Sequence, residues 1–219
     1  MSFIINPFRF GGFAFGNCLQ SDGNNDFVAF SNFSVGFTED YTFNLWMKAD
    51  IVRASFHLFA SGNTSSWFGY SNPTTITVGV DALSFTVPAC DTNWNMHTYS
   101  RISNTTKVYV NAVESVTGGL AGNSAIQFLE LFSYPTRTLG WDGLGDEIAV
   151  LKGTGATQAN ITDLYNGGAG ADFDAVMGSS KAYWKLNESG TDTTVVEVNG
   201  NYNGTLNNYP ASGMWVPHI

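Results

Sequence analysis

Alternation of apolar and polar residues over positions 41–48 is the clearest structural pattern in the chain. A period of two is typical of a β-strand that buries one face. We therefore expect a strand here, with Trp46 on its wetter side. Tyr41, Phe43, Leu45 and Met47 share one side, and Thr42, Asn44, Trp46 and Lys48 share the other.

Other short apolar runs follow the same pattern, and turn-forming Gly, Pro, Asn, Asp and Ser residues separate them. Regularly spaced short strands indicate a sandwich or a barrel. The further strands that we expect span residues 13–20, 27–31, 55–61, 67–71, 74–80, 83–87, 96–102, 106–111, 126–133 and 181–186.

One short helix is expected after residue 156. Thr157 is a suitable N-cap, Ile161 and Leu164 share one face with Tyr165, and Gly167-Gly168 end the helix. A single helix leaves the class all-β. Since no linker, charge run or internal repeat divides the chain, we expect one domain over residues 1–219, closed by strands from residues 175–219.

The stretch 141–151 places acidic residues directly before an apolar strand. We expect a turn at Asp142-Gly143, two carboxylates at Asp146 and Glu147, and a core strand over 148–151. Carboxylates at a sheet edge are costly unless water, backbone amides or a cation meets them. The stretch is therefore a candidate functional region.

The amino-acid composition limits the kinds of partner that the protein can bind. The net charge is −9, and the nine Lys and Arg residues form no cluster, which argues against nucleic acid and against an anionic membrane. The first ten residues lack the pattern of a signal peptide, and no stretch is long enough to span a bilayer. Cys18 and Cys90 either close one long loop or remain free thiols, and the lack of a secretory signal favours free thiols.

Several segments, taken in order, match a known family. They are Cys-Leu-Gln-Ser-Asp-Gly-Asn-Asn-Asp-Phe-Val at 18–28, Tyr-Thr-Phe-Asn-Leu-Trp-Met-Lys at 41–48, Asp-Gly-Leu-Gly-Asp-Glu-Ile at 142–148, Ile-Thr-Asp-Leu-Tyr-Asn-Gly-Gly at 161–168 and Ala-Tyr-Trp-Lys-Leu-Asn-Glu at 182–188. Together they resemble a laminin G-like domain of the concanavalin A-like lectin/glucanase superfamily. The resemblance implies a jelly-roll sandwich of two antiparallel sheets. The segment at 182–188 commonly opens such a domain and here comes last, so the sandwich is either permuted or capped differently.

The resemblance also implies calcium, because a cation in such domains often joins an early Asp-Gly turn to the late Asp-Glu stretch. Calcium takes six to eight oxygen ligands at about 2.3 to 2.6 Å. The alternative is that these residues only build turns, which Asp and Asn favour without any metal. The matching positions are Asp22, Asn25, Asp26, Asp142 and Asp146.

Sugar binding is a second hypothesis. Sugars stack their C–H faces on aromatic rings and place their hydroxyls on amides and carboxylates. Rings flanked by Ser, Asn and Asp at strand ends are therefore candidates, although ordinary core packing is the alternative for each of them. These rings are Trp67, Tyr70, Trp94 and Trp141.

Catalysis has little support in the sequence. The glucanases of this superfamily carry two glutamates around an aspartate on one strand, and no Glu-x-Asp-x-Glu or Glu-x-Asp-x-x-Glu occurs here. A triad built on His57, His97 or His218 lacks a Gly-x-Ser-x-Gly motif. We therefore expect a protein that is not an enzyme.

Chains of this kind, rich in Gly and aromatic residues and without a leader, resemble structural proteins of tailed bacteriophages. We expect a virion-associated protein of capsid, head fibre or tail, made in the host cytoplasm, that contacts its own copies or other virion proteins and has host glycans as candidate ligands. Residues 1–12 are either a docking arm or a first core strand. The alternative is a secreted or cell-surface bacterial carbohydrate-binding protein.

Overall fold

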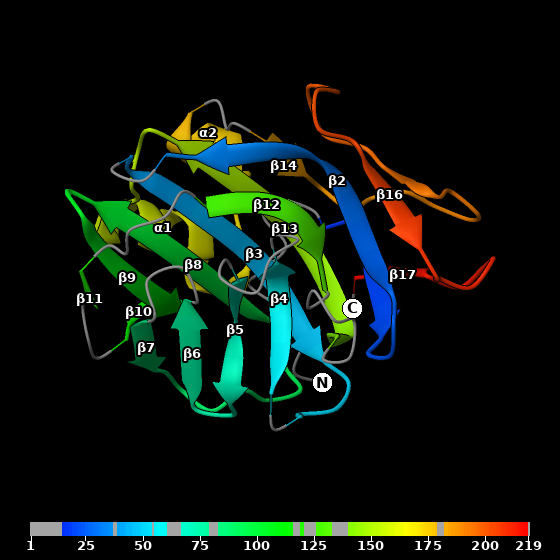
Figure 1. The fold of residues 1–219 in the computed structure, drawn as a ribbon, viewed down its shortest axis with the longest axis horizontal. Helices are drawn as coiled ribbons and strands as arrows, with labels where there is room; N and C mark the ends of the chain where they lie inside the picture. The colour runs from blue at the N-terminus through cyan, green and yellow to red at the C-terminus, as the bar shows by residue number, and fades with distance from the viewer. Residues whose placement is uncertain are drawn as a thin grey trace, which may run out of the picture.

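Two antiparallel β-sheets pack face to face in the computed structural model (Figure 1). The structure describes residues 15–36, 39–53, 55–60, 67–78, 83–115, 119–120, 126–132, 140–178 and 182–218. The expected all-β jelly-roll sandwich is confirmed.

The first sheet runs in the order β10-β9-β8-β3-β13-β1-β17, with β11 paired to β9 and β14 paired to β13. Its strands are β1 (Asn17–Asp22), β3 (Tyr41–Ala49), β8 (Asn95–Ile102), β9 (Thr105–Val110), β10 (Val113–Glu114), β11 (Gly119–Leu120), β13 (Asp142–Lys152), β14 (Ala182–Trp184) and β17 (Trp215–Pro217).

The second sheet runs in the order β15-β16-β2-β12-β4-β5-β6-β7. Its strands are β2 (Phe27–Val35), β4 (Phe56–Ala60), β5 (Trp67–Asn72), β6 (Thr75–Val78), β7 (Leu83–Thr86), β12 (Ile126–Leu131), β15 (Thr194–Val195) and β16 (Gly204–Asn207).

The main core lies between the sheets, and β3 contributes its predicted apolar side to it. Tyr41, Phe43 and Leu45 are fully buried there against residues of both sheets, such as Phe68 and Tyr99. Period-two alternation therefore placed this strand correctly, because a pleated strand sends successive side chains to opposite faces.

The outer face of the first sheet is covered by α1 (Gln158–Tyr165), η2 (Asn166–Gly168) and α2 (Phe173–Met177). In Figure 1 the yellow α1 lies behind β3 and β8. Trp46 packs in this second cluster with only 3% of its surface exposed, so the expectation of a wet position for it was wrong. The helices shield a ring that alternation alone assigned to solvent.

The predicted helix cap at Thr157 is confirmed. The Thr157 side chain accepts from the Asn160 backbone nitrogen, and Asn166 ends α1 in the left-handed region at φ 47°. The helix α2, begun by Asp172, was not expected, so the described residues hold two short α-helices rather than one.

Strand β13 differs from the expected turn-then-strand arrangement. Asp142 and Gly143 begin the strand and pair with Asp22 and Ser21 of β1, so the predicted turn at these two residues was wrong. The register against β3 shifts between Asp146 and Ala149, and Glu147 has φ 49°. Such a bulge breaks the alternation of the strand and turns neighbouring side chains to new positions.

Residues after 175 contribute strands to both sheets. β14 pairs with β13, β16 pairs with β2, and β17 pairs with β1, so the C-terminal segment lies across one end of the sandwich. The proposed arm at residues 1–12 lies outside the described residues.

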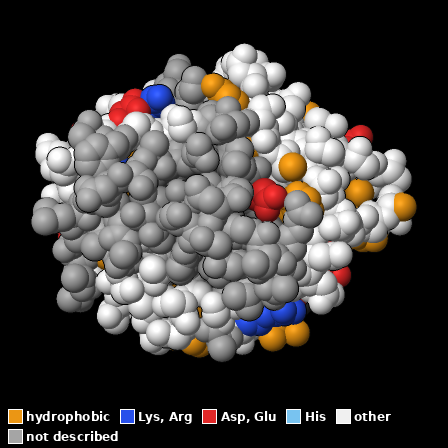
Figure 2. All heavy atoms as spheres, viewed as in Figure 1, with side chains coloured by type: hydrophobic (Ala, Val, Ile, Leu, Met, Phe, Trp, Pro, Cys, Tyr) orange, Lys and Arg blue, Asp and Glu red, His pale blue; other side chains and the backbone are white. Residues whose placement is uncertain are grey.

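The surface charge and the state of the cysteines are in line with the amino-acid composition. On the face drawn in Figure 2, most described side chains are neither acidic nor basic, and the charged ones are scattered. Cys18 and Cys90 are both free thiols, as the sequence favoured. No helix within the described ranges is both long and apolar enough to cross a membrane.

Candidate functional site

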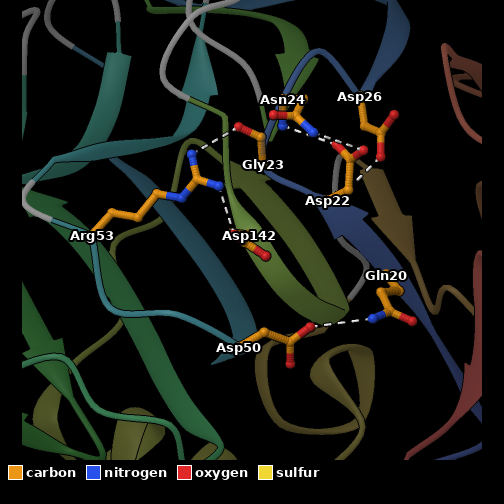
Figure 3. Close-up of polar contacts among 8 residues, drawn as sticks. All are labelled: Gln20, Asp22, Gly23, Asn24, Asp26, Asp50, Arg53 and Asp142. Carbon is orange, nitrogen blue, oxygen red and sulfur yellow. Dashed lines mark hydrogen bonds and ion pairs between the residues drawn. The ribbon is translucent and has the colours of Figure 1, made fainter.

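Four of the five predicted calcium ligands lie at one end of the first sheet, where β1 meets β13. Asp22 stands opposite Asp142 in the antiparallel register, and Asp26 accepts a hydrogen bond of 3.0 Å from the Asp22 backbone nitrogen (Figure 3). Asn25 adjoins them, and its carbonyl accepts from the Asn208 side chain. The three carboxylates line a cavity of about 420 Å³, which we call the acidic rim.

Local hydrogen bonds set the charges of this rim. Burial favours the neutral form of Asp22, but hydrogen bonds from the backbone and side-chain nitrogens of Asn24 outweigh it and lower the pKa of Asp22. Burial raises the pKa of Asp26 to about 6, and the nearby charge of Asp22 adds to the rise. The oxygens of the turn are thus already engaged by its own N–H groups.

Arg53 supplies a fixed cation to the acidic rim. Its Nη1 donates to the Gly23 carbonyl at 3.1 Å, and its Nη2 donates to Asp142 Oδ2 at 2.6 Å (Figure 3). A Cβ at Gly23 would lie 2.6 Å from Nη2, so this contact requires glycine. The guanidinium thereby joins the early turn to β13, the role that the resemblance assigns to calcium.

The residues as placed therefore do not fit a calcium ion. Among the described residues, no group of three or more His, Cys, Asp or Glu side chains is arranged to hold a metal. Calcium binding stays a prediction, and it requires Arg53 to leave Asp142.

Asp146 does not join the acidic rim. It lies four residues further along β13 than Asp142, roughly 13 Å by the rise of a strand. Its side chain is fully buried, and its Oδ2 lies 2.7 Å from Nδ1 of His218. The structure thus separates this predicted ligand from the other four.

The predicted sugar-binding rings are dispersed. Tyr70 and Trp141 are buried in the core, with 1% and 0% of their surfaces exposed, so neither offers a ring to a ligand. The Tyr70 hydroxyl is hydrogen-bonded to His97, and Trp141 Nε1 donates to the Leu144 carbonyl. Trp67 begins β5, and its side chain lies outside the described residues. Of the three rings whose side chains the structure describes, Trp94 lines a cavity on the surface.

That cavity, which we call the aromatic cavity, has a volume of about 350 Å³ on the outer face of the first sheet. Pockets that hold small ligands in proteins have volumes of about 300 to 1,000 Å³. Its walls combine four rings with small residues of the turn that follows α1. The lining residues are Phe15, Trp46, Trp94, Gly167, Gly168, Ala169 and His218.

Three of the rings are stacked nearly parallel. The His218 ring lies between Phe15, at 4.0 Å between centroids, and Trp94, at 3.9 Å, with interplanar angles of 8° and 7°. Trp46 meets Phe15 edge-on at 5.4 Å and stacks on Tyr165 of α1 at 6.0 Å. The sheet, the helix and the segment after β17 therefore hold these rings in fixed orientations.

The His218–Asp146 pair behind the stack is electrically neutral overall. Burial lowers the pKa of His218 to about 4, and the positive charge of Lys48 adds to the effect. Burial raises the pKa of Asp146 to about 9, and the negative charge of Glu147 adds to the rise. Between these values the pair holds one proton in total, whichever of the two groups carries it, so it presents no net charge to the cavity.

Glu147, on the other side of the bulge, is also buried. Its Oε2 accepts from the Tyr183 hydroxyl, and burial raises the pKa of Glu147 to about 8. Two neighbouring buried carboxyl groups thus have separate partners on either side of the bulge.

Besides the aromatic cavity, a second cavity that could hold a ligand, of about 400 Å³, lies near the start of α1. Lys107 and Glu114 form an ion pair of 2.8 Å within it, and Tyr109 donates to Glu114 at 3.4 Å. It presents one ring and a paired charge, so it offers less stacking surface than the aromatic cavity. Its other lining residues are Ser100, Ile102, Thr105, Ala156, Thr157 and Gln158.

Burial sets the properties of His97 and of the two thiols. His97 is buried against the Tyr70 hydroxyl at 2.8 Å, and burial lowers the pKa of His97 to about 4. Burial raises the pKa of Cys18 to about 12 and that of Cys90 to about 11, so both are poor nucleophiles. The side chain of His57 lies outside the described residues.

Sequence reasoning missed most of the aromatic cavity. Trp94, one of the predicted sugar-binding rings, lines this cavity, and the alternation in β3 marked Trp46 as facing away from the main core. No sequence signal joined Phe15 and His218, which come from opposite ends of the chain.

Comparisons with known proteins show the fold. No protein-family model and no curated protein matches the chain. Among solved structures, a candidate carbohydrate-binding protein from Bacteroides ovatus matches 87% of this chain at 15% identity, with a TM-score of 0.66. The chain covers 59% of that protein, so it spans less than two thirds of its length.

Two further structures are similar over most of the chain. The heptameric SAP-like pentraxin of Limulus polyphemus matches 69% of this chain and 82% of its own, at 11% identity and a TM-score of 0.52. The enzymatically active domain of tailspike protein 2 from bacteriophage CBA120 matches 78% of this chain and 30% of its own, at 14% identity and a TM-score of 0.52. At such identities the likeness shows a jelly-roll sandwich of antiparallel sheets and no more.

Proposed function

We propose that this protein binds carbohydrate, without transforming it, in the aromatic cavity. The observation that carries the proposal is the Phe15–His218–Trp94 stack beside Trp46, which forms one wall region of a ligand-sized cavity. A sugar ring presents apolar C–H faces, and burying them on fixed aromatic surfaces is favourable.

Small residues form the rest of the described cavity wall. Gly167 and Gly168, which have φ of 63° and 95°, line the cavity with Ala169, and residues without long side chains leave room there for a sugar ring. A lectin-type sandwich is a scaffold on which such a site is reasonable, and the Bacteroides ovatus protein of the same fold is a candidate carbohydrate binder. Fold alone does not assign the function, so the proposal rests on the cavity.

Binding without catalysis is supported by the lining. Glycosidases place two carboxyl groups about 5 to 10 Å apart across the scissile bond. None of the described residues that line the aromatic cavity carries a carboxyl group, and the nearby Asp146 is buried against the His218 imidazole.

The test is binding of purified protein to a broad glycan array, performed once with calcium and once with chelator. We expect a defined set of sugars to bind in both conditions, and Trp94→Ala to abolish the signal. Lys107→Ala, in the second cavity, is the matched control and should bind as the unchanged protein does. A silent array, or binding lost with Lys107→Ala instead, would overturn the assignment to this cavity.

A virion role is the second part of the proposal. We infer that the domain is displayed on a virus particle, on the basis of the resemblance to phage structural proteins and of the fold that the chain has in common with a phage tailspike domain. The competing assignment is a bacterial carbohydrate-binding protein outside a virion, in line with the Bacteroides ovatus neighbour.

Three measurements separate these assignments. Mass spectrometry and immunogold labelling of purified particles should detect a virion protein, and light scattering should find a stable homo-oligomer or a complex with a particle protein. A monomer that is absent from particles and that binds sugar alone would support the bacterial alternative.

A further inference from the structure

The described walls of the aromatic cavity consist of rings and small residues. Four lining residues contribute rings, and residues 167–169 contribute backbone atoms and one methyl group. No Asp, Glu, Lys or Arg is among the described residues that line it. On these walls a ligand meets ring faces, backbone atoms and the imidazole of His218.

The described groups behind the walls place no cation at the cavity surface for an acidic sugar. The Nδ1 of His218 lies 2.7 Å from the fully buried Asp146, which already engages it. Lys48 acts on His218 through space but does not line the cavity. A sugar carboxylate placed here would lose hydration without gaining a counter-charge, which is costly.

The net charge of the whole chain also disfavours acidic sugars. Its net charge of −9 repels anions over the surface and lowers their local concentration. The net charge of the chain and the lining of the cavity therefore both favour an uncharged ligand.

We propose that the aromatic cavity selects an uncharged pyranose and rejects sugar acids such as uronic or sialic acids. This inference rests on the proposed carbohydrate binding and names its ligand class. Stacking supplies the affinity, and the absence of a cation on the wall supplies the discrimination.

Matched sugar pairs test the selection. Glucose and glucuronic acid, or galactose and galacturonic acid, differ at one carbon, so titrations of their methyl glycosides, followed by tryptophan fluorescence or calorimetry, isolate the charge. We expect the acid of each pair to bind at least about tenfold more weakly. Affinity for the neutral sugar should not change between low and high salt, because no ion pair contributes to it.

A charge added to the wall gives a second test that does not weaken the fold. Ala169 is half-buried in an ordinary helical conformation at φ −81°, so it accepts a longer side chain. Ala169→Arg should raise the affinity for the acid relative to the neutral sugar by about tenfold, whereas Ala169→Gln, similar in reach and uncharged, should not.

The outcomes are distinguishable. Equal or tighter binding of the acid by the unchanged protein would overturn the selection and leave carbohydrate binding intact. Absence of binding to every sugar would overturn the proposed function and this inference with it. An unchanged ratio in Ala169→Arg would show that discrimination does not arise at this wall and would overturn the inference.

Discussion

His218 and Asp146 lie 72 residues apart in the sequence, and a hydrogen bond of 2.7 Å joins the imidazole Nδ1 to the carboxyl Oδ2. The contact holds the segment after β17 against the bulge of β13. Because the same imidazole separates Phe15 from Trp94, the geometry of the aromatic cavity depends on a contact made at the end of the chain.

Replacement of His218 by alanine should therefore affect both stability and binding. The change removes the middle ring of the stack and leaves the buried Asp146 without its partner, and loss of one member of a buried pair costs about 3 kcal/mol. We expect a fall of that order in the free energy of unfolding, measured by urea denaturation, together with loss of sugar binding.

His218→Phe is the matched control for this change. It keeps a ring between Phe15 and Trp94 but cannot hydrogen-bond to Asp146. It should retain more sugar affinity than His218→Ala while still losing stability. If both variants bind sugar as the unchanged protein does, the stack is not part of the site.

Stability should decrease as the pH rises above neutrality. Burial raises the pKa of Asp146 to about 9 and that of Glu147 to about 8, whereas both titrate near 4 in an unfolded chain. The folded protein thus holds protons that the unfolded chain has released, and stability is lost as the pH approaches the folded-state pKa values. His218, whose pKa burial lowers to about 4, opposes this trend only below about pH 6.5. We expect the melting temperature to fall steadily from about pH 6.5 to about pH 9.

The double variant Asp146→Asn, Glu147→Gln tests the origin of that slope. Both amides keep the size of the side chain and remove the titration, so the melting temperature should become nearly independent of pH over the same range. A slope that persists in the double variant would assign the pH dependence to other groups.

Arg53 should control the response to calcium. Its guanidinium bonds to Asp142 and to the Gly23 carbonyl, and it is about one-third exposed, so Arg53→Ala should cost about 1 kcal/mol or less. The variant leaves the acidic rim without its cation. We expect millimolar calcium to raise the melting temperature of Arg53→Ala and to leave that of the unchanged protein where it was.

Two controls sharpen the calcium test. Arg53→Lys keeps a positive charge at the rim and should remain unresponsive. Asp142→Asn added to Arg53→Ala should remove the response, because it removes the carboxylate that Arg53 held. A rise in the melting temperature of the unchanged protein with calcium would show that the ion competes with the guanidinium and would support the cation site that the resemblance implies.

Patterns of local origin could be read from the sequence. The alternation at Tyr41–Ala49 identified the strand and its core face, and Thr157 marked the start of α1, because strand pleating and helix capping depend on neighbouring residues. The resemblance also brought Asp22 and Asp142 together at one end of the first sheet, as the register shows.

Features of long-range origin could not be read in this way. The register of β13 against β3 shifts between Asp146 and Ala149, and alternation carries no sign of an inserted residue. Arg53 reaches the rim from a loop, and His218 reaches the cavity from the end of the chain. Such pairings depend on how the strands are assembled, so a single sequence does not specify them.

Gly143 should resist substitution because two strands approach closely at its Cα. A Cβ built there would lie 2.2 Å from the Lys48 carbonyl oxygen, and φ is 144°, a value that L-residues rarely adopt. Gly143→Ala should therefore lower the free energy of unfolding by about 3 kcal/mol in urea denaturation. Gly213→Ala is the control, since its φ of 87° is also unfavourable but its Cβ would meet no atom within 4 Å, so a smaller loss of about 1 kcal/mol is expected. Equal losses in both variants would show that φ, and not the contact with β3, sets the requirement for glycine at position 143.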